Sequence, residues 1–218
     1  MSHKEKPNLI ANVFDDWAES GRADRMAEGH QFAATHAFDY LDVQADMSVL
    51  DIGCGLGYAV RWAASVDPTV SALGIDLAPN MIKKASALST ELPGATFRSG
   101  QFPEVVHGIE FDRIFSVEAL YYMPNLDIAL EAVVASLKPG GKFVTVIDHY
   151  FENDACHDWH EMVGVPLVLW SIEEWTAGLS RAGLEAIGAQ QLRHPSTEQA
   201  DDWQQSCGSL ILWGMRPV

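Results

Sequence analysis

The spacing of apolar residues changes near residue 45. Before that point they recur at helical intervals, and Gly21 and Gly29 are expected to interrupt the helices. After it, short apolar runs alternate with helical patterns. The expected strands are 48–53, 71–76, 95–98, 111–117 and 142–147, and the expected helices are 58–66, 80–90 and 126–137. This alternation predicts an α/β fold in which a parallel sheet carries helices on both faces.

The last quarter of the chain has a different pattern. Ser171 and Glu174 form a capping box that opens a helix expected to end at Gly183. Apolar runs at 184–191 and 209–215 predict two strands joined by a polar loop, and so an antiparallel edge on the sheet. Pro139, Gly140 and Gly141 are expected to end the helix before them. One domain, 1–218, is therefore predicted, with an N-terminal helical lid (1–45), a core (46–150) and C-terminal cover helices with a strand pair (151–218).

The charge narrows the choice of partners. Among 218 residues, 14 are Lys or Arg and 30 are Asp or Glu, which gives a formal net charge of −16. This excess of acid argues against nucleic acid and against an anionic membrane surface as partners. Three widely spaced cysteines, with no apolar leader and no apolar run of about 18 residues, favour a cytoplasmic location.

A glycine-rich segment follows the first expected strand. Gly53, Gly55 and Gly57 alternate with other residues, in the order G-x-G-x-G, between a buried strand and a helix. Glycines there let the backbone approach a ligand closely. The second strand ends at Asp76, whose carboxylate can accept hydrogen bonds from both hydroxyls of a ribose, and Leu77 can cover an adenine ring. The pattern predicts a nucleoside-containing ligand at the carboxyl ends of the strands.

Three segments together resemble class I S-adenosylmethionine (SAM)-dependent methyltransferases: VLDIGCGLGYA (49–59), GIDLAPNMIKKA (74–85) and FDRIFSVEALYYMPNLDIALEAVVASLKPGGKFVTV (111–146). The similarity is greatest to the small-molecule branch (type 11) typified by the quinone-biosynthesis C-methyltransferases. It is strong over residues 47–148 and weak elsewhere. It implies a Rossmann-like three-layer sandwich with a seven-stranded, mostly parallel sheet and an antiparallel last strand.

The resemblance also implies a binding site for SAM, whose demethylated product is S-adenosylhomocysteine. In the family the glycine loop holds the methionine part and the strand-two acid holds the ribose. Gln101 stands where many relatives have an Asp that meets the adenine amine, and its amide oxygen can still accept that hydrogen bond. The implied cofactor residues are Asp51, Gly53, Cys54, Gly55, Gly57, Asp76, Leu77, Gln101, Phe102 and Glu118.

Candidates for the acceptor side come from three places. His149 follows the fifth strand and is the first choice for a general base, because its side chain titrates in the useful range. Tyr121 and Tyr122 follow the fourth strand, where one can contact the acceptor and the other is expected in the core. The N-terminal helices add His30, together with two arginines that can clamp an acceptor carboxylate or pair with surface acid. These arginines are Arg22 and Arg25.

No metal site is predicted. Cys156, His157 and His160 lie close together, but no second pair of ligands stands at zinc spacing. The expected function is methyl transfer from SAM to O, N, S or C of a small molecule, by a monomer or homodimer. A non-catalytic SAM-binding partner protein and a SAM-fold enzyme with other chemistry remain as alternatives.

Overall fold

A computed structural model describes residues 9–195 and 201–218. Its centre is a seven-stranded sheet in the order β3-β2-β1-β4-β5-β7-β6. The strand β7 pairs antiparallel with both β5 and β6, and the other pairs are parallel. The strands are β1 (Ser48–Ile52), β2 (Ser71–Asp76), β3 (Ala95–Ser99), β4 (Phe111–Val117), β5 (Leu137–Ile147), β6 (Glu185–Leu192) and β7 (Ser209–Met215).

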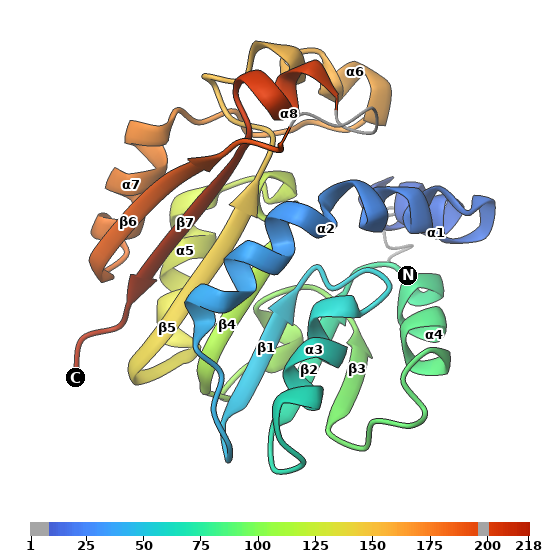
Figure 1. Ribbon diagram of the computed structural model, residues 1–218, viewed down its shortest axis with the longest axis vertical. Coiled ribbons are helices and arrows are strands. Elements are labelled where there is room, and N and C mark those ends of the chain that lie inside the picture. The colour runs from blue at the N-terminus through green and yellow to red at the C-terminus, as the bar shows by residue number, and fades with distance from the viewer. Residues whose placement is uncertain (1–8, 196–200) are drawn as a thin grey trace, which may run out of the picture.

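Helices cover both faces of this sheet, as Figure 1 shows. Their bounds are α1 (Leu9–Ser20), α2 (Arg22–Leu41), α3 (Tyr58–Val66), α4 (Pro79–Ala87), α5 (Leu126–Ala135), α6 (Trp159–Val163), α7 (Ile172–Arg181) and α8 (Asp202–Ser206). Three short 3-10 turns are η1 (Glu104–Val106), η2 (Leu120–Tyr122) and η3 (Asp154–Cys156). The predicted Rossmann-like sandwich with an antiparallel last strand is confirmed.

Two hydrophobic cores hold the layers together. On one face, α2 and α3 pack their small residues, such as Ala37 and Ala63, against Val49 and Phe115 of the sheet. On the other face, α5 and α7 pack residues such as Leu130 and Trp175 against the strands. Because both faces are covered, the central strands are almost continuously buried. Such runs are what parallel sheets require.

The N-terminal helices differ from the expectation at one glycine. Gly21, with φ 72°, separates α1 from α2 as predicted, but Gly29 lies inside α2 and does not interrupt it. A glycine within a helix costs only about 1 kcal/mol. The burial of Ala33, Ala37 and Leu41 against the sheet is a larger effect and holds the helix together.

The other element boundaries also shift. The helix expected at 80–90 is α4, which begins at Pro79, a favoured first helical residue, and ends at Ala87. The helix expected to run to Leu137 ends at Ala135, so the Pro139–Gly141 turn does not end it. The turn instead forms an irregularity inside β5, where the register with β4 shifts.

The C-terminal strands form the antiparallel pair that the sequence predicts. The polar connection between them contains the short helix α8, and β7 lies between β5 and β6, so that β6 forms the edge of the sheet. All three cysteines are free. Within the described part of the chain, no helix has both the length and the apolar character needed to cross a bilayer.

Candidate active site

The glycine loop after β1 is held against the end of β2. The backbone N–H groups of Gly53 and Cys54 both donate to the carbonyl of Ile75, at 2.9 and 3.0 Å. Gly53 has φ +73°, and a Cβ atom on it would lie 2.3 Å from the Cβ of Ala119. Gly55 also has positive φ, but a Cβ on it would meet nothing within 4 Å. The loop is therefore packed at Gly53 and leaves open space beside Gly55.

Asp76 anchors this loop. One of its carboxylate oxygens accepts a hydrogen bond from the N–H of Gly55 and the other accepts one from the N–H of Ala78, each at 2.9 Å. Burial raises the pKa of the Asp76 carboxyl, although these two hydrogen bonds oppose the shift. Each oxygen keeps a further lone pair. Asp76 can thus shape the loop and still receive two hydroxyl groups of a ligand.

A cavity of about 570 Å³ opens at the carboxyl ends of β1, β2 and β4. Its inner wall consists of the glycine loop, the ends of these strands and the segment around Gln101 and Phe102. Its outer wall comes from α1, α2, η2 and the start of α5. The N-terminal helices therefore form one side of the cavity, and Figure 1 shows α1 and the start of α2 at that end of the sheet.

Four acidic side chains gather at this end of the sheet. Asp51 is 4 % exposed, and burial, followed by the charge of Asp76, raises its pKa to about 8. Burial, followed by the charge of Asp148, also raises the pKa of Glu118 well above its ordinary value. The two oxygens of Glu118 accept hydrogen bonds from the Tyr121 hydroxyl, at 2.7 Å, and from the Asp148 N–H. A cationic ligand would therefore favour the ionised form of these carboxyls.

His30 of α2 meets this acidic group from the lid. Its Nε2 lies 3.7 Å from Oδ2 of Asp148, and the two side chains are 14 % and 1 % exposed. Burial lowers the pKa of His30, and the charge of Asp148 partly offsets this. His30 lines the cavity and Asp148 does not, so the carboxylate stands behind the imidazole. The neutral form of His30 is favoured near neutral pH.

His149 is placed elsewhere. It is 2 % exposed and does not line the cavity, and its ring packs against those of Tyr121 and Trp159. Burial lowers its pKa to about 4. The structure thus places His30 on the cavity wall, and not His149, the histidine that the sequence favoured as base. The guanidinium of Arg22 lies over the ring of Trp17, at 3.9 Å, and neither it nor Arg25 lines the cavity.

Most of the predicted cofactor residues line the cavity, with one exception. Gly57 lies behind the loop, where a Cβ would meet the ring of Phe97 at 2.5 Å, so it serves packing. Tyr121 and Tyr122 both line the cavity, and Tyr121 is at the same time almost fully buried, with 3 % of its surface exposed. The lining residues from the prediction are Asp51, Gly53, Cys54, Gly55, Asp76, Leu77, Gln101, Phe102 and Glu118.

Two residues of the cavity wall were not predicted from the sequence. Tyr58, the first residue of α3, lines the cavity, and its place directly after the glycine loop was the available signal. Phe14 of α1 lines it as well and packs edge-on against Tyr122, with ring centroids 5.1 Å apart. Asp148 follows β5 directly, at the same sheet edge as the other acids. Its position directly after a strand already indicates, from the sequence alone, that it lies at the ligand edge.

The cysteine–histidine group near α6 does not form a cluster of free ligands. The Sγ of Cys156 donates to the carbonyl of Tyr150. A ring nitrogen of His157 contacts the carbonyl of Phe151, and one of His160 contacts the carbonyl of His157. Each of these side chains is thus engaged with a backbone carbonyl nearby.

Known proteins share both the sequence and the fold. Residues 43–192 match a family model described as a methyltransferase domain. The chain is 27% identical to the 2-methyl-6-phytyl-1,4-hydroquinone methyltransferase of Synechocystis, over 76% of this chain and 56% of the relative. It is 27% identical to a sterol 24-C-methyltransferase of Pneumocystis carinii, over 85% of this chain and 54% of the relative. The chain thus spans about half the length of these curated relatives.

A solved structure covers almost the whole chain. In the complex between the Haloferax volcanii Trm112 methyltransferase activator and a methyltransferase, the matching chain is 28% identical, with a TM-score of 0.83. The match covers 94% of this chain and 98% of that one. The family model spans more than half of the sequence, and the strand order, the glycine loop and the acid at the end of β2 agree with it. The chain belongs to the class I SAM-dependent methyltransferase family.

Proposed function

We propose that this chain binds SAM in the cavity at the carboxyl ends of β1, β2 and β4 and transfers its methyl group to a small molecule. The observation that carries the proposal is the pairing of open space beside Gly55 with buried acid at the same end of the sheet. The sulfonium and ammonium groups of SAM would compensate the carboxylates of Asp51 and Glu118. Asp76 would accept the ribose hydroxyls.

The residues around this cavity fit the donor. Glu118, Gln101 and Phe102, which the resemblance assigns to the methionine and adenine ends of SAM, all line this cavity. When bound, SAM supplies an activated methyl group, so the chain has to position the acceptor in line with the S–CH3 bond and exclude water. The α1–α2 lid closes the outer side of the cavity and suits that task. An open cavity under an ordered lid also favours an enzyme over a non-catalytic binding protein.

A small acceptor fits the charge and the shape better than a nucleic acid. Binding to a phosphate backbone relies on clustered Lys and Arg. The chain carries a net charge of −16, and the described residues that line the cavity include no Lys or Arg. The hydroquinone and sterol methyltransferases among the relatives are consistent with a small acceptor.

Calorimetry with SAM tests the donor site. Wild-type protein is expected to bind SAM, and Asp76→Ala is expected to weaken binding by about 1.5 to 3 kcal/mol, the scale of a lost charged hydrogen bond. Asp127→Ala serves as the control, because Asp127 pairs with Arg181 on the surface, away from the cavity. If Asp76→Ala and Asp127→Ala bind SAM equally well, the assignment of Asp76 to the ribose is wrong.

A protein partner is the second candidate feature. The Haloferax volcanii match is a methyltransferase in complex with the Trm112 activator, and it covers nearly all of this chain. We therefore propose that an activator subunit of this kind can bind the chain. Co-expression with Trm112 followed by size-exclusion chromatography is the test, and separate elution of the two proteins would argue for a monomer or homodimer instead.

A further inference from the structure

The cavity has two zones of different chemistry. Its outer zone is built from apolar and aromatic side chains of α1, α2, η2 and α5. Phe14 contributes to two edge-on ring pairs there, one with Trp17 and one with Tyr122, each with centroids 5.1 Å apart. Aromatic and apolar walls of this kind suit a largely apolar molecule. The residues of this outer zone are Ile10, Phe14, Trp17, Met26, Tyr122 and Ile128.

The inner zone is polar and holds one base. A ring nitrogen of His30 and one carboxylate oxygen each of Glu118 and Asp148 lie within 4.8 Å of one another. Both oxygens of Glu118 already accept hydrogen bonds, from Tyr121 and from the backbone of Asp148. His30 lines the cavity, and its neutral imidazole has a lone pair that can accept a proton. Of the three groups, it is therefore the one suited to act as a base.

The charge of the cavity restricts what enters it. Among the described residues that line it, acid is abundant and neither Lys nor Arg is present. Arg22 lies over the ring of Trp17 and outside the lining, where its charge acts on Tyr122 at the outer end of the cavity and not on the acids of the inner zone. An acceptor that carries a carboxylate or phosphate would meet Asp51 and Glu118 without a counter-charge, which is costly in a buried site.

From this arrangement we propose that the acceptor is an uncharged, largely apolar molecule with a weakly acidic hydroxyl, such as a phenol, and that His30 removes its proton. Asp148 is a positioning residue, because it holds the imidazole from behind without reaching the cavity. The inference rests on the proposed function, since it names the acceptor class for the same site.

The step balances without a further reactant. The hydroxyl proton passes to the lone pair of His30 as the oxygen forms a bond to the methyl carbon. The S–CH3 bond breaks, and its electron pair stays on sulfur. The imidazolium stands beside the carboxylate of Asp148 and later loses the proton to water.

The surroundings of His30 determine the expected pH dependence. Asp148 from the end of β5 and Glu118 from the end of β4 face it, while Tyr58 of α3 and Tyr121 of η2 stay neutral because burial raises the pKa of both hydroxyls. Burial lowers the pKa of His30 below 6.5. Turnover should therefore rise with pH through a value below 6.5 and then level off.

The experiment measures transfer of labelled methyl from SAM to a panel of phenols, with trans-aconitate and histamine as the charged alternatives. Wild-type protein is expected to methylate phenols and to leave trans-aconitate unmodified. His30→Gln should lower kcat about 10²- to 10³-fold, the usual range for a lost general base, while the Kd for SAM stays within about twofold. His36→Gln is the matched control on the same helix, because His36 is exposed and contacts only the Phe32 carbonyl and ring.

Two further measurements separate catalysis from a structural role. Added imidazole should restore part of the activity of His30→Ala. Asp148→Asn removes the charge that raises the pKa of His30, so the rising limb of its pH profile should move to lower pH.

The outcomes are distinguishable. If SAM binds and no phenol is methylated or bound, or if trans-aconitate or histamine is the preferred acceptor, the acceptor class is wrong and the proposed function stands. Equal turnover in His30→Gln and His36→Gln, or activity lost to EDTA and restored by a divalent cation, would overturn the role of His30. If SAM does not bind at all, the proposed function itself fails.

Discussion

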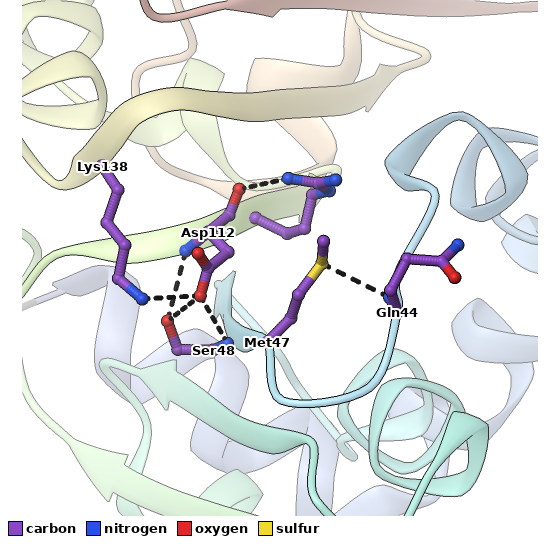
Figure 2. A network of polar contacts seen from close by, with 6 residues as sticks. Gln44, Met47, Ser48, Asp112 and Lys138 are labelled. Atoms are coloured by element: carbon purple, nitrogen blue, oxygen red, sulfur yellow. Dashed lines mark hydrogen bonds and ion pairs between the residues drawn. The ribbon is translucent and has the colours of Figure 1, made fainter. Parts of the chain in front are cut away.

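Two aspartates on neighbouring strands have opposite electrostatic environments. Asp112 lies near the amino end of β4, where its carboxylate accepts hydrogen bonds from Lys138, at 2.7 Å, and from the backbone and hydroxyl of Ser48, at 2.8 and 2.7 Å (Figure 2). These partners lower its pKa to about 2. Asp51 lies near the carboxyl end of β1, where burial and Asp76 raise its pKa to about 8.

The difference separates an end of the sheet whose acid is satisfied within the chain from the end where we propose that a ligand binds. At the amino end the acid has its counter-charge and its hydrogen bonds within the chain. At the carboxyl end several acids share one cavity, and the described residues that line it include His30 but no Lys or Arg. Buried charge without compensation destabilises a fold, so that it is most often found where a ligand completes it.

The largest expected effect comes from neutralising Asp51. Asp51→Asn should weaken SAM binding by about 1.5 to 3 kcal/mol, because a charge opposite the ligand is lost. The same substitution should increase the free energy of unfolding of the ligand-free protein at pH 9. At that pH the wild-type carboxyl is ionised in a buried site, which is unfavourable, whereas the amide carries no charge. Calorimetry and urea unfolding measure the two effects. Equal loss of binding and of stability would mean that Asp51 is structural, as Asp112 is.

The pH dependence of SAM binding sharpens the contrast. Between pH 5.5 and 7.5 the Asp51 carboxyl of the free protein is mostly protonated, since its pKa is about 8. A cationic ligand favours the ionised form, so binding releases a proton and affinity should rise with pH, by up to about tenfold per unit. Calorimetry in two buffers with different ionisation enthalpies counts the protons. S-adenosylhomocysteine, which lacks the sulfonium charge, should show a weaker dependence.

The smallest effect is expected at the amino end. Asp112→Asn should reduce the free energy of unfolding by about 1 kcal/mol at pH 7, since the ion pair with Lys138 is partly exposed and screened. The lowered pKa of Asp112 means that this stabilisation is present above pH 4 and is lost as the pH falls toward 2. Urea unfolding at pH 7 and pH 3 tests this. SAM affinity should not change.

Local patterns predicted the parts of the site that are close in sequence. The glycine loop and Asp76 sit where strand ends must place them, because a parallel sheet brings successive carboxyl ends to one edge. The meeting of His30 with Asp148 could not be predicted, since it depends on how α2 crosses the sheet. His149 was favoured over His30 because position after a strand shows which edge a residue occupies, but not which way its side chain points.

The same limit applies to the fold. The alternation of strands and helices predicted the layers, but the place of β7 between β5 and β6 depends on long-range pairing. Local propensity predicts a break at Gly29 because it does not include the burial that α2 gains against the sheet. The Pro139–Gly141 turn is expected to end the preceding helix, but that helix ends at Ala135 and the turn lies inside β5. Tertiary contacts override weak local signals at such points.

The continuity of α2 has a mechanical consequence. The helix is 20 residues long, about 30 Å, and its second half is fixed in the core through residues such as Ala37, while its first half carries His30 over the cavity. The first half of the helix therefore cannot move as a rigid body unless the second half loses its packing against the sheet. Gly21, with its positive φ, is the hinge between α1 and α2. If the chain bent there to admit a ligand, α1 would separate from α4. The hydrogen bond that Asp15 accepts from the N–H of Asn80, at 2.8 Å, would then break. Such a movement of α1 would leave His30 in the same position on the cavity wall before and after the acceptor enters.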